Sequence, residues 1–210
     1  MKYSIMKIPV NKKQQFKFTI GIDEVGRGPI AGPVAVGAFV FLVPDASSHF
    51  KGVKESKQLK EEKREEWFGR ILEMQKKGLI DFEVTFQSEK VIDTKGISFA
   101  IKKALEMSIK RLKIDFKKTL VLLDGGLHAP AEYTSQKTII KGDVKERVIA
   151  FASICAKVMR DRYMRKMAKK YPEYGFDVHK GYGTKRHYEA IKKYGLTDLH
   201  RRSFLIENSE

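Results

Sequence analysis

Apolar and polar residues recur along this chain with two different periods, which together predict an α/β domain. In residues 16–24 the phenylalanine and isoleucine side chains lie two apart, a spacing typical of a strand with one buried face. Residues 34–42 are apolar on both faces, so we expect a second strand that is buried on both sides. Residues 82–86 alternate as a third strand, and the three strands predict an antiparallel meander.

Apolar residues recur at helical spacing in four other segments. These are residues 59–77, residues 97–112, a long stretch from 144 to Pro172, and residues 184–194. The long stretch is apolar almost all round in its first half, so we expect that half to be buried, with Cys155 packed there as a small hydrophobe. Its second half is basic. Thr184 begins the last segment and is expected to cap it.

Two more strands complete a predicted mixed sheet. Residues 119–123, TLVLL, form an apolar run of the kind found in a central strand covered on both faces. Residues 137–140 form a short strand, and residues 44–48 are expected to be a loop. The chain then divides into a polar tail at 1–15, an α/β domain at 16–172 and a helical extension at 173–210.

The charge of the chain favours an acidic polymer as its partner. Its 210 residues include 42 Lys and Arg against 26 Asp and Glu, a formal net charge of +16, and nucleic acid is the simplest match. A highly soluble lysine-rich surface would have the same balance. No apolar stretch approaches the ~20 residues of a membrane-spanning helix. The single cysteine excludes an internal disulfide. We therefore expect a cytoplasmic monomer with no membrane contact.

A candidate site follows the first predicted strand, where residues 20–34 read IGIDEVGRGPIAGPV. Asp23 and Glu24 end the strand and leave it on opposite faces, so Glu24 reaches the same site only if the backbone bends there. Carboxylates repel phosphate unless a hard cation lies between them, so acids beside a phosphate-binding turn imply magnesium or manganese. From spacing alone, solvated acids at a strand-to-turn junction fit the pattern equally well.

The glycine turn after these acids is suited to a polyanion. Gly26 and Gly28 let the backbone approach a ligand closely and expose N–H groups. Arg27 between them adds a planar fork that fits phosphate or the edge of a base or sugar. Residues 52–60, GVKESKQLK, form a second loop whose lysines and serine would suit phosphate, although a solvated loop has the same composition.

Three residues further along the chain are also candidates. Asp124 ends the fourth predicted strand before two glycines, and is thus a second carboxylate at a strand end. Asp143 directly precedes a predicted helix, and its position alone favours an N-cap over a metal ligand. Tyr182 lies between glycines in the basic loop HKGYGTK, where it suits stacking on a base or sugar and equally suits ordinary packing.

In their order along the chain, these motifs resemble type 2 ribonuclease H, the bacterial ribonuclease HII. The matching segments lie between residues 19 and 204 and read GIDEVGRGPIAGPV, VKESK, LLDGG, KGD, ASICAKVMRDR, HKGYGTK and HRRSF. The resemblance implies an α/β, ribonuclease H-like fold, a mixed five-stranded sheet flanked by helices, with a helical C-terminal extension. It also implies a set of four catalytic, metal-binding carboxylates, namely Asp23, Glu24, Asp124 and Asp143.

The resemblance further implies where the substrate binds. The backbone of Gly26, Arg27 and Gly28 would read the 2′-hydroxyl of a ribonucleotide, and Tyr182 would stack at the RNA-to-DNA junction. Contacts with phosphates are implied for three residues of family motifs, namely Lys57, Ser153 and Lys157. Basic residues on the long helix and the tail would hold the duplex backbone. Glu55 departs from the family, which more often has aspartate there, and this puts the hydrogen bonding of its loop in doubt.

The implied activity is endonucleolytic cleavage with two magnesium or manganese ions. Its substrates would be the RNA strand of RNA/DNA hybrids and DNA duplexes containing ribonucleotides. A single embedded ribonucleotide would be cut on its 5′ side, leaving 5′-phosphate and 3′-hydroxyl ends. Such cleavage would serve the removal of embedded ribonucleotides and of RNA primers.

Two other classes compete with this interpretation. Ribonuclease HIII usually has lysine where this chain has Arg27, and it has an extra N-terminal domain, for which the position of Asp23 leaves no room. A non-catalytic, basic RNA-binding protein on the same fold would bind without metal-dependent turnover, and the four acids argue against it. The fold alone would also admit integrase-like or resolvase-like DNA nucleases.

Overall fold

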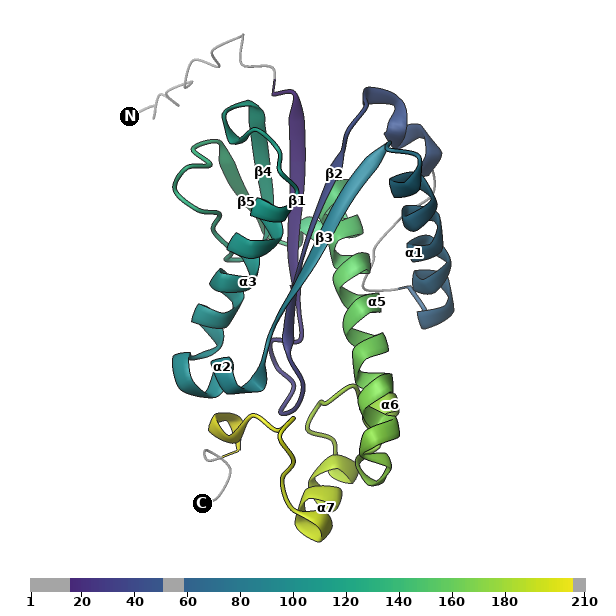
Figure 1. Ribbon diagram of the computed structural model, residues 1–210, viewed down its shortest axis with the longest axis vertical. Helices are drawn as coiled ribbons and strands as arrows, with labels where there is room; N and C mark the ends of the chain where they lie inside the picture. Colours follow the sequence, from purple (N-terminus) through teal and green to yellow (C-terminus); the bar gives the residue numbers. More distant parts are fainter. Residues whose placement is uncertain (1–15, 51–58, 206–210) are drawn as a thin grey trace, which may run out of the picture.

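The computed structural model describes residues 16–50 and 59–205 of the chain (Figure 1). The tail expected at 1–15 and two residues of the predicted phosphate loop, Glu55 and Lys57, lie outside these ranges. What the sequence predicts for them therefore stays a prediction. No helix in the described ranges is both long enough and apolar enough to cross a membrane.

A mixed sheet of five strands forms the centre of the molecule, in the order β3-β2-β1-β4-β5. The strands are β1 (Phe18–Val25), β2 (Val34–Phe41), β3 (Ile80–Gln87), β4 (Thr119–Asp124) and β5 (Gln136–Ile139). β2 pairs antiparallel with both β1 and β3, which confirms the predicted meander. β4 joins β1 in parallel, and β5 joins β4 in parallel, so the predicted mixed sheet is confirmed.

Helices cover both faces of this sheet (Figure 1). They are α1 (Glu61–Lys76), α2 (Glu89–Lys95), α3 (Ile97–Arg111), α4 (Gly142–Lys145), α5 (Arg147–Lys170), α6 (Phe176–His179) and α7 (Lys185–Tyr194). α1 and α5 share one apolar cluster with the sheet, and α2 and α3 share a second cluster on the opposite face. Thr184 caps α7 as predicted, because its side chain accepts a hydrogen bond from the His187 N–H.

Two glycines in the sheet let α5 lie directly against it. A Cβ on Gly21 of β1 would lie 2.2 Å from the Val148 carbonyl carbon, and one on Gly37 of β2 would lie 2.3 Å from the Ala152 oxygen. Any larger residue at either position would push the helix away from the sheet. Because Gly37 pairs with Asp23, this close contact holds the first half of α5 beside the carboxyl end of β1.

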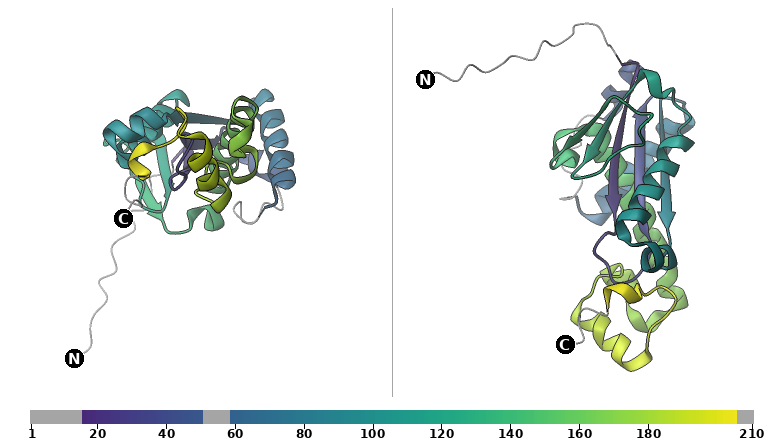
Figure 2. Two further views of the ribbon diagram at one scale, coloured as in Figure 1. Left: turned by 90° about the horizontal axis from the view of Figure 1, so that it is seen from below. Right: turned by 90° about the vertical axis from the view of Figure 1, so that its left-hand side faces the viewer.

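Residues 173–205, called the C-terminal segment below, pack beyond the end of β1. They lie against the second half of α5 and the turn between β1 and β2 (Figure 2). The buried members of this third apolar cluster are Ala31, Met164, Ala168, Tyr174, Phe176, Ala190 and Leu199. A backbone bridge also pairs Ala31 of the turn with His200 of the segment. The turn that carries the candidate glycines is therefore enclosed by residues from the end of the chain.

The structure corrects two local predictions and adds one helix. Residues 44–48 are not a loop but part of a 3-10 helix, Pro44–Phe50, which buries Ala46 and Phe50. The short helix α2 was not predicted. The long helix does not start near Val144, because Glu146 is extended, with φ −122° and ψ 118°, and separates α4 from α5.

Candidate active site

Three of the four predicted carboxylates lie at one edge of the sheet. Ile22 of β1 pairs in parallel register with Leu123 of β4, so Asp23 and Asp124 follow at the same level on neighbouring strands. The Gly142 N–H donates to Asp124 Oδ1 at 2.7 Å, which ties Asp124 to the turn that carries Asp143. Asp23, Asp124 and Asp143 are 1%, 8% and 2% exposed. Burial of three acids at one edge requires compensation by donors or cations.

Asp143 is not an N-cap, and the capping interpretation is wrong. The N-cap residue of α4 is Lys141, in the left-handed region at φ 55°, and Asp143 lies inside the first turn of α4. α5 in turn begins after Glu146. The chain turns at Lys141, and a Cβ on the following Gly142 would lie only 2.6 Å from the Ile149 side chain, so glycine is needed between that turn and Asp143. The position of Asp143 is thus compatible with a metal ligand.

Glu24 lies next to the buried acids but is more open. Its N–H donates to Asp23 Oδ1 at 2.9 Å. Its side chain is 18% exposed, and Glu24 Oε1 lies 3.7 Å from Arg27 Nη1. Glu24 therefore reaches the pocket that opens at the end of β1.

The four acids fit a hard divalent cation by their chemistry, because Mg²⁺ and Mn²⁺ prefer carboxylate oxygens. Across residues 16–50 and 59–205, however, no three acidic, histidine or cysteine side chains are gathered closely enough to enclose an ion. Carboxylates of like charge repel one another unless a cation lies between them. The fold therefore brings Asp23, Asp124 and Asp143 to one edge without a closed ligand set.

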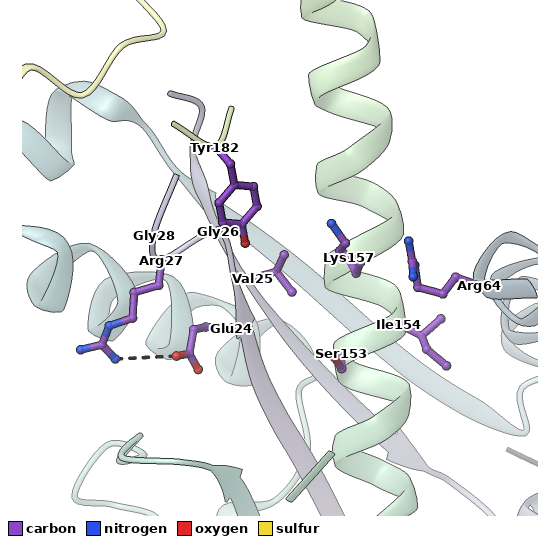
Figure 3. Close-up of a pocket in the computed structure, with 10 residues that line it drawn as sticks. All are labelled: Glu24, Val25, Gly26, Arg27, Gly28, Arg64, Ser153, Ile154, Lys157 and Tyr182. Atoms are coloured by element: carbon purple, nitrogen blue, oxygen red, sulfur yellow. Dashed lines mark ion pairs between the residues drawn. The ribbon is translucent and has the colours of Figure 1, made fainter. Parts of the chain in front are cut away.

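A pocket of about 310 Å³ opens beside these acids (Figure 3). It brings together seven of the residues predicted from the sequence, namely Glu24, Gly26, Arg27, Gly28, Ser153, Lys157 and Tyr182. The glycine turn and α5 lie on opposite sides of it in Figure 3. Asp23, Asp124 and Asp143 do not line the pocket. Arg64 of α1 does, although the polar face of α1 is typical of a solvated helix and the sequence did not single it out.

A buried acid holds two cations at the pocket wall. Lys157 Nζ donates to Asp161 Oδ1 at 2.8 Å, and Arg64 Nη2 lies 3.8 Å from Asp161 Oδ2. Burial lowers the pKa of Lys157 from its ordinary value, and the hydrogen bond to Asp161 opposes that shift. Asp161 was missed, although its spacing of four residues from Lys157 on one helix is the signal of such a pair.

The basic second half of α5 does not present all its charges to solvent as expected. Arg160 is fully buried. Arg162 and Arg165 form ion pairs with Glu65 of α1, and Arg165 also pairs with Glu61. These arginines pair with neighbouring parts of the molecule, so fewer basic side chains of α5 are available to bind the backbone of a duplex.

Tyr182 is 47% exposed and lines the pocket, so it is not packed in a core. Its ring lies against the glycine turn: a Cβ on Gly28 would be 3.9 Å from Tyr182 Cε1. Two histidines hydrogen-bond the backbone of the loop that carries Tyr182. His187 Nδ1 lies 2.9 Å from the Tyr182 carbonyl oxygen, and the Gly181 N–H donates to His179 Nδ1 at 3.1 Å.

The hydrogen bonds of the buried His187 and His200 indicate which ring nitrogen of each neutral imidazole carries the proton. The Thr197 N–H donates to His200 Nδ1 at 2.9 Å, so the proton of His200 lies on Nε2. His200 Nε2 then donates to His187 Nε2 at 3.1 Å, and His187 Nδ1 donates to the Tyr182 carbonyl. Burial lowers the pKa of each of these two histidines to about 4, which keeps the chain of bonds neutral at pH 7.

Comparison with known proteins finds a consistent set of relatives. The family model described as Ribonuclease HII matches residues 20–206. A Ribonuclease HII from Caldicellulosiruptor bescii is 45% identical over 190 residues, which cover 90% of this chain and 87% of that protein. A Ribonuclease HII from Clostridium beijerinckii is 44% identical over 193 residues, which cover 91% and 69%. A chain from the structure of the PCNA:RNase HII complex from Archaeoglobus fulgidus aligns with a TM-score of 0.71 at 27% identity, covering 88% of this chain and 93% of that chain.

Proposed function

The chain belongs to the ribonuclease HII family of metal-dependent endoribonucleases that act on RNA/DNA, and we propose that it cuts at single ribonucleotides embedded in duplex DNA. The proposed cut lies on the 5′ side of the ribonucleotide and leaves 5′-phosphate and 3′-hydroxyl ends. The RNA strand of RNA/DNA hybrids is the second proposed substrate. One observation carries this proposal: buried acids at the ends of β1 and β4 adjoin a pocket lined by a glycine turn and basic side chains.

The residues proposed to hold two magnesium or manganese ions are Asp23, Glu24, Asp124 and Asp143. Bound divalent ions supply an activated water and stabilise the leaving oxygen in phosphodiester hydrolysis. The chain contributes the positions of the four carboxylates, since β1 and β4 hold Asp23 and Asp124 on a rigid sheet. The bond from Gly142 to Asp124 holds the α4 turn in place, which keeps Asp143 at the same edge.

The pocket wall formed by α5 and α1 supports binding of the phosphate backbone. Lys157 and Arg64 both line the pocket, and Asp161 holds each of them in place. We propose that they bind the phosphates next to the cut, together with the Ser153 hydroxyl. Lys57, outside the described residues, is proposed for the same role on the strength of the family motif alone.

The opposite wall supports recognition of the ribonucleotide itself. The backbone of Gly26, Arg27 and Gly28 lines the pocket and is proposed to bind the 2′-hydroxyl, the group that separates RNA from DNA at one position. The half-exposed ring of Tyr182 lies beside Gly28 and is proposed to stack at the junction between ribonucleotide and deoxyribonucleotide.

The experiment uses a labelled DNA duplex with one ribonucleotide, incubated with magnesium, with manganese, or with EDTA. An all-DNA duplex of the same sequence and a long RNA/DNA hybrid are run beside it, and every cut is mapped to the nucleotide. We expect a metal-dependent cut immediately 5′ of the ribonucleotide and none in the all-DNA duplex. Cleavage of the long hybrid alone would overturn the proposed specificity, and tight binding without any cleavage would overturn the proposed reaction.

A further inference from the structure

Two arginines, Arg160 and Arg201, are fully buried where the C-terminal segment meets the turn between β1 and β2. Burial of a guanidinium group is costly unless its donors are satisfied, so its contacts indicate what it stabilises. Burial lowers the pKa of Arg201 to about 9, which leaves the group charged at pH 7. Glu89 of α2 is a buried carboxylate whose charge acts on both arginines.

Among the described residues, the partners of the Arg201 guanidinium are carbonyl oxygens of the glycine turn. Nη2 donates to Gly26 O at 2.7 Å, Nη1 donates to Arg27 O at 3.0 Å, and Nε donates to Gly32 O at 2.8 Å. The planar fork therefore holds two successive peptide groups on one side, with a third bond further along the turn. A lysine at this position has a single ammonium group and cannot reproduce that geometry.

The direction of these carbonyls determines the direction of the neighbouring N–H groups. In a trans peptide the C=O and N–H of one peptide unit point in opposite directions. The Gly26 carbonyl shares a peptide with the Arg27 N–H, and the Arg27 carbonyl shares one with the Gly28 N–H. Since Arg201 draws both carbonyls towards itself, both N–H groups point away from it. Neither N–H donates to a backbone carbonyl in the turns and loops of residues 16–50 and 59–205.

Successive N–H groups that point the same way form a small site for an acceptor oxygen. Gly26, Arg27 and Gly28 all line the 310 Å³ pocket, so these donors belong to the wall that faces the proposed substrate. Gly26 takes φ 89°, a conformation that glycine adopts without strain and that orients this part of the turn.

We propose that Arg201 is a positioning residue for ribonucleotide recognition, which directs the N–H groups of Arg27 and Gly28 towards the 2′-hydroxyl oxygen. This inference rests on the proposed function, because it assumes that the turn reads the ribonucleotide. It assigns a role to a side chain that lies on the far side of the turn from the pocket and touches no substrate.

Arg160 provides a matched control within the same chain. It is equally buried and also donates to three carbonyl oxygens, those of Ala31, Pro33 and Lys180. None of these belongs to Gly26 or Arg27. Arg160 also packs against Gly26, where an added Cβ would lie 2.2 Å from Arg160 Nε. Its hydrogen bonds, however, join the far part of the turn to Lys180 in the loop before Tyr182, and the carbonyls of Gly26 and Arg27 are bonded by Arg201 instead.

The test compares Arg201→Lys with Arg160→Lys, because both keep a positive charge and both lose the guanidinium fork. Affinity is measured in EDTA for a DNA duplex with one ribonucleotide and for the all-DNA duplex of the same sequence. For Arg201→Lys we expect the preference for the ribonucleotide to fall at least about tenfold, with affinity for all-DNA duplex nearly unchanged. Arg160→Lys should keep the preference, although both variants lower Tm.

If Arg201→Lys keeps its binding preference for the ribonucleotide and the unaltered protein cleaves normally, the proposed function stands while the role of Arg201 is overturned. An equal loss of preference in both lysine variants, in proportion to their loss of Tm, also overturns it, since it indicates a general structural role. No cleavage at the ribonucleotide by the unaltered protein overturns the proposed function and this inference with it.

A second measurement uses the unaltered protein, in case Arg201→Lys does not fold. The amide NMR signals of Arg27 and Gly28 are followed in EDTA while each duplex is added. We expect both signals to shift more with the ribonucleotide-containing duplex than with the all-DNA duplex. Signals that respond equally to the two duplexes overturn the proposal.

Discussion

The central sheet and the C-terminal segment are stabilised in different ways. On the sheet, large apolar side chains such as Phe39, Phe50 and Phe151 pack in contact with one another, within two large apolar clusters. The C-terminal segment has a much smaller apolar cluster, and buried polar side chains such as Arg201 and His187 supply the rest of its contacts.

This difference separates two tasks. Burial of apolar side chains is strongly stabilising but has no preferred direction. It therefore determines how deeply a strand or helix is buried, but it does not determine the orientation of a single peptide group. Hydrogen bonds have direction, and here they end on the carbonyls of Gly26, Arg27 and Tyr182, in the wall proposed to read the ribonucleotide. The proposed metal-binding acids Asp23 and Asp124 instead lie on the rigid sheet. A substitution should therefore be able to abolish cleavage without changing the binding preference for the ribonucleotide, and the reverse.

The largest effect is expected for Asp23→Asn, which removes a proposed metal ligand from the sheet. Cleavage at an embedded ribonucleotide should fall at least about a thousandfold, because a lost ligand weakens stabilisation of the transition state by several kcal/mol. The preference for the ribonucleotide-containing duplex in EDTA should remain. Steady-state cleavage and equilibrium binding are measured on the same preparation, with Glu62→Gln on the exposed face of α1 as control.

Turnover by Asp23→Asn close to that of the Glu62→Gln control would remove Asp23 from the proposed metal site. Loss of the binding preference together with cleavage would show that the sheet and the C-terminal segment do not act separately.

The second largest effect compares two buried rings, Phe151 in the sheet cluster and Phe176 in the third cluster. Phe151→Ala should lower the free energy of unfolding by about 3–5 kcal/mol, since it leaves a cavity among Phe39, Phe50 and Trp67. Phe176→Ala should mainly open the C-terminal segment. Amide hydrogen exchange distinguishes the two, because local opening speeds exchange in the segment while the sheet stays protected.

Uniformly faster exchange in Phe176→Ala, as in Phe151→Ala, would mean that the segment and the sheet unfold as one unit. That result would contradict the division between them.

The sheet and the position of its acids follow from the sequence because they depend on period and chain order. Alternation predicts the strands, and a carboxylate directly after an apolar strand must lie at a sheet edge, which placed Asp23 and Asp124 correctly. The mixed order of strands is likewise confirmed. The role of these acids in metal binding stays a prediction, as do the substrate contacts of Ser153 and Lys157.

The buried polar contacts do not follow from the sequence. Arg160 and Arg201 lie in basic stretches that are typical of a surface that binds phosphate, yet both are fully buried. Their partners are backbone carbonyls, which every residue possesses, so no residue type marks the contact. For Arg201 those partners lie about 170 residues earlier in the chain, as the separation of 169 from Gly32 shows. Only the folded chain reveals that Arg201 of the HRRSF motif bonds the carbonyls of the glycine turn.

A smaller effect is expected from pH. Burial lowers the pKa of His187 and of His200 to about 4 in the folded protein, below the ordinary histidine value of 6.5, so the folded state binds fewer protons than the unfolded state in this range. Their contribution is therefore complete above pH 6.5 and is lost as the pH falls towards 4, by on the order of 3 kcal/mol for each histidine. His49 and His128, which lie outside the C-terminal segment, are exposed, so exchange should quicken first in that segment.

Urea denaturation between pH 7 and pH 4 measures this loss. His187→Gln should be less stable at pH 7 but show a shallower decline with pH, since one titrating group is gone. His128→Asn, which removes an exposed histidine, serves as control and should keep the slope of the unaltered protein. An equal slope in His187→Gln would contradict the assignment.

The smallest effect is expected from a substitution that removes one hydrogen bond of the C-terminal segment and leaves the aromatic ring in place. Tyr174 is 1% exposed, stacks on Phe176 with 5.4 Å between ring centroids, and its hydroxyl donates to the Gly195 carbonyl at 2.7 Å. Tyr174→Phe should lower the free energy of unfolding by about 1 kcal/mol, the usual net value of such a bond. Gly195 is far along the chain from the glycine turn and holds none of its carbonyls, so cleavage should change less than about twofold.

Tyr194→Phe, at a half-exposed ring, controls for the loss of a hydroxyl alone. A loss of ribonucleotide preference in Tyr174→Phe as large as that expected for Arg201→Lys would mean that recognition depends on the stability of the whole segment, and the specific part assigned to the arginine would be contradicted.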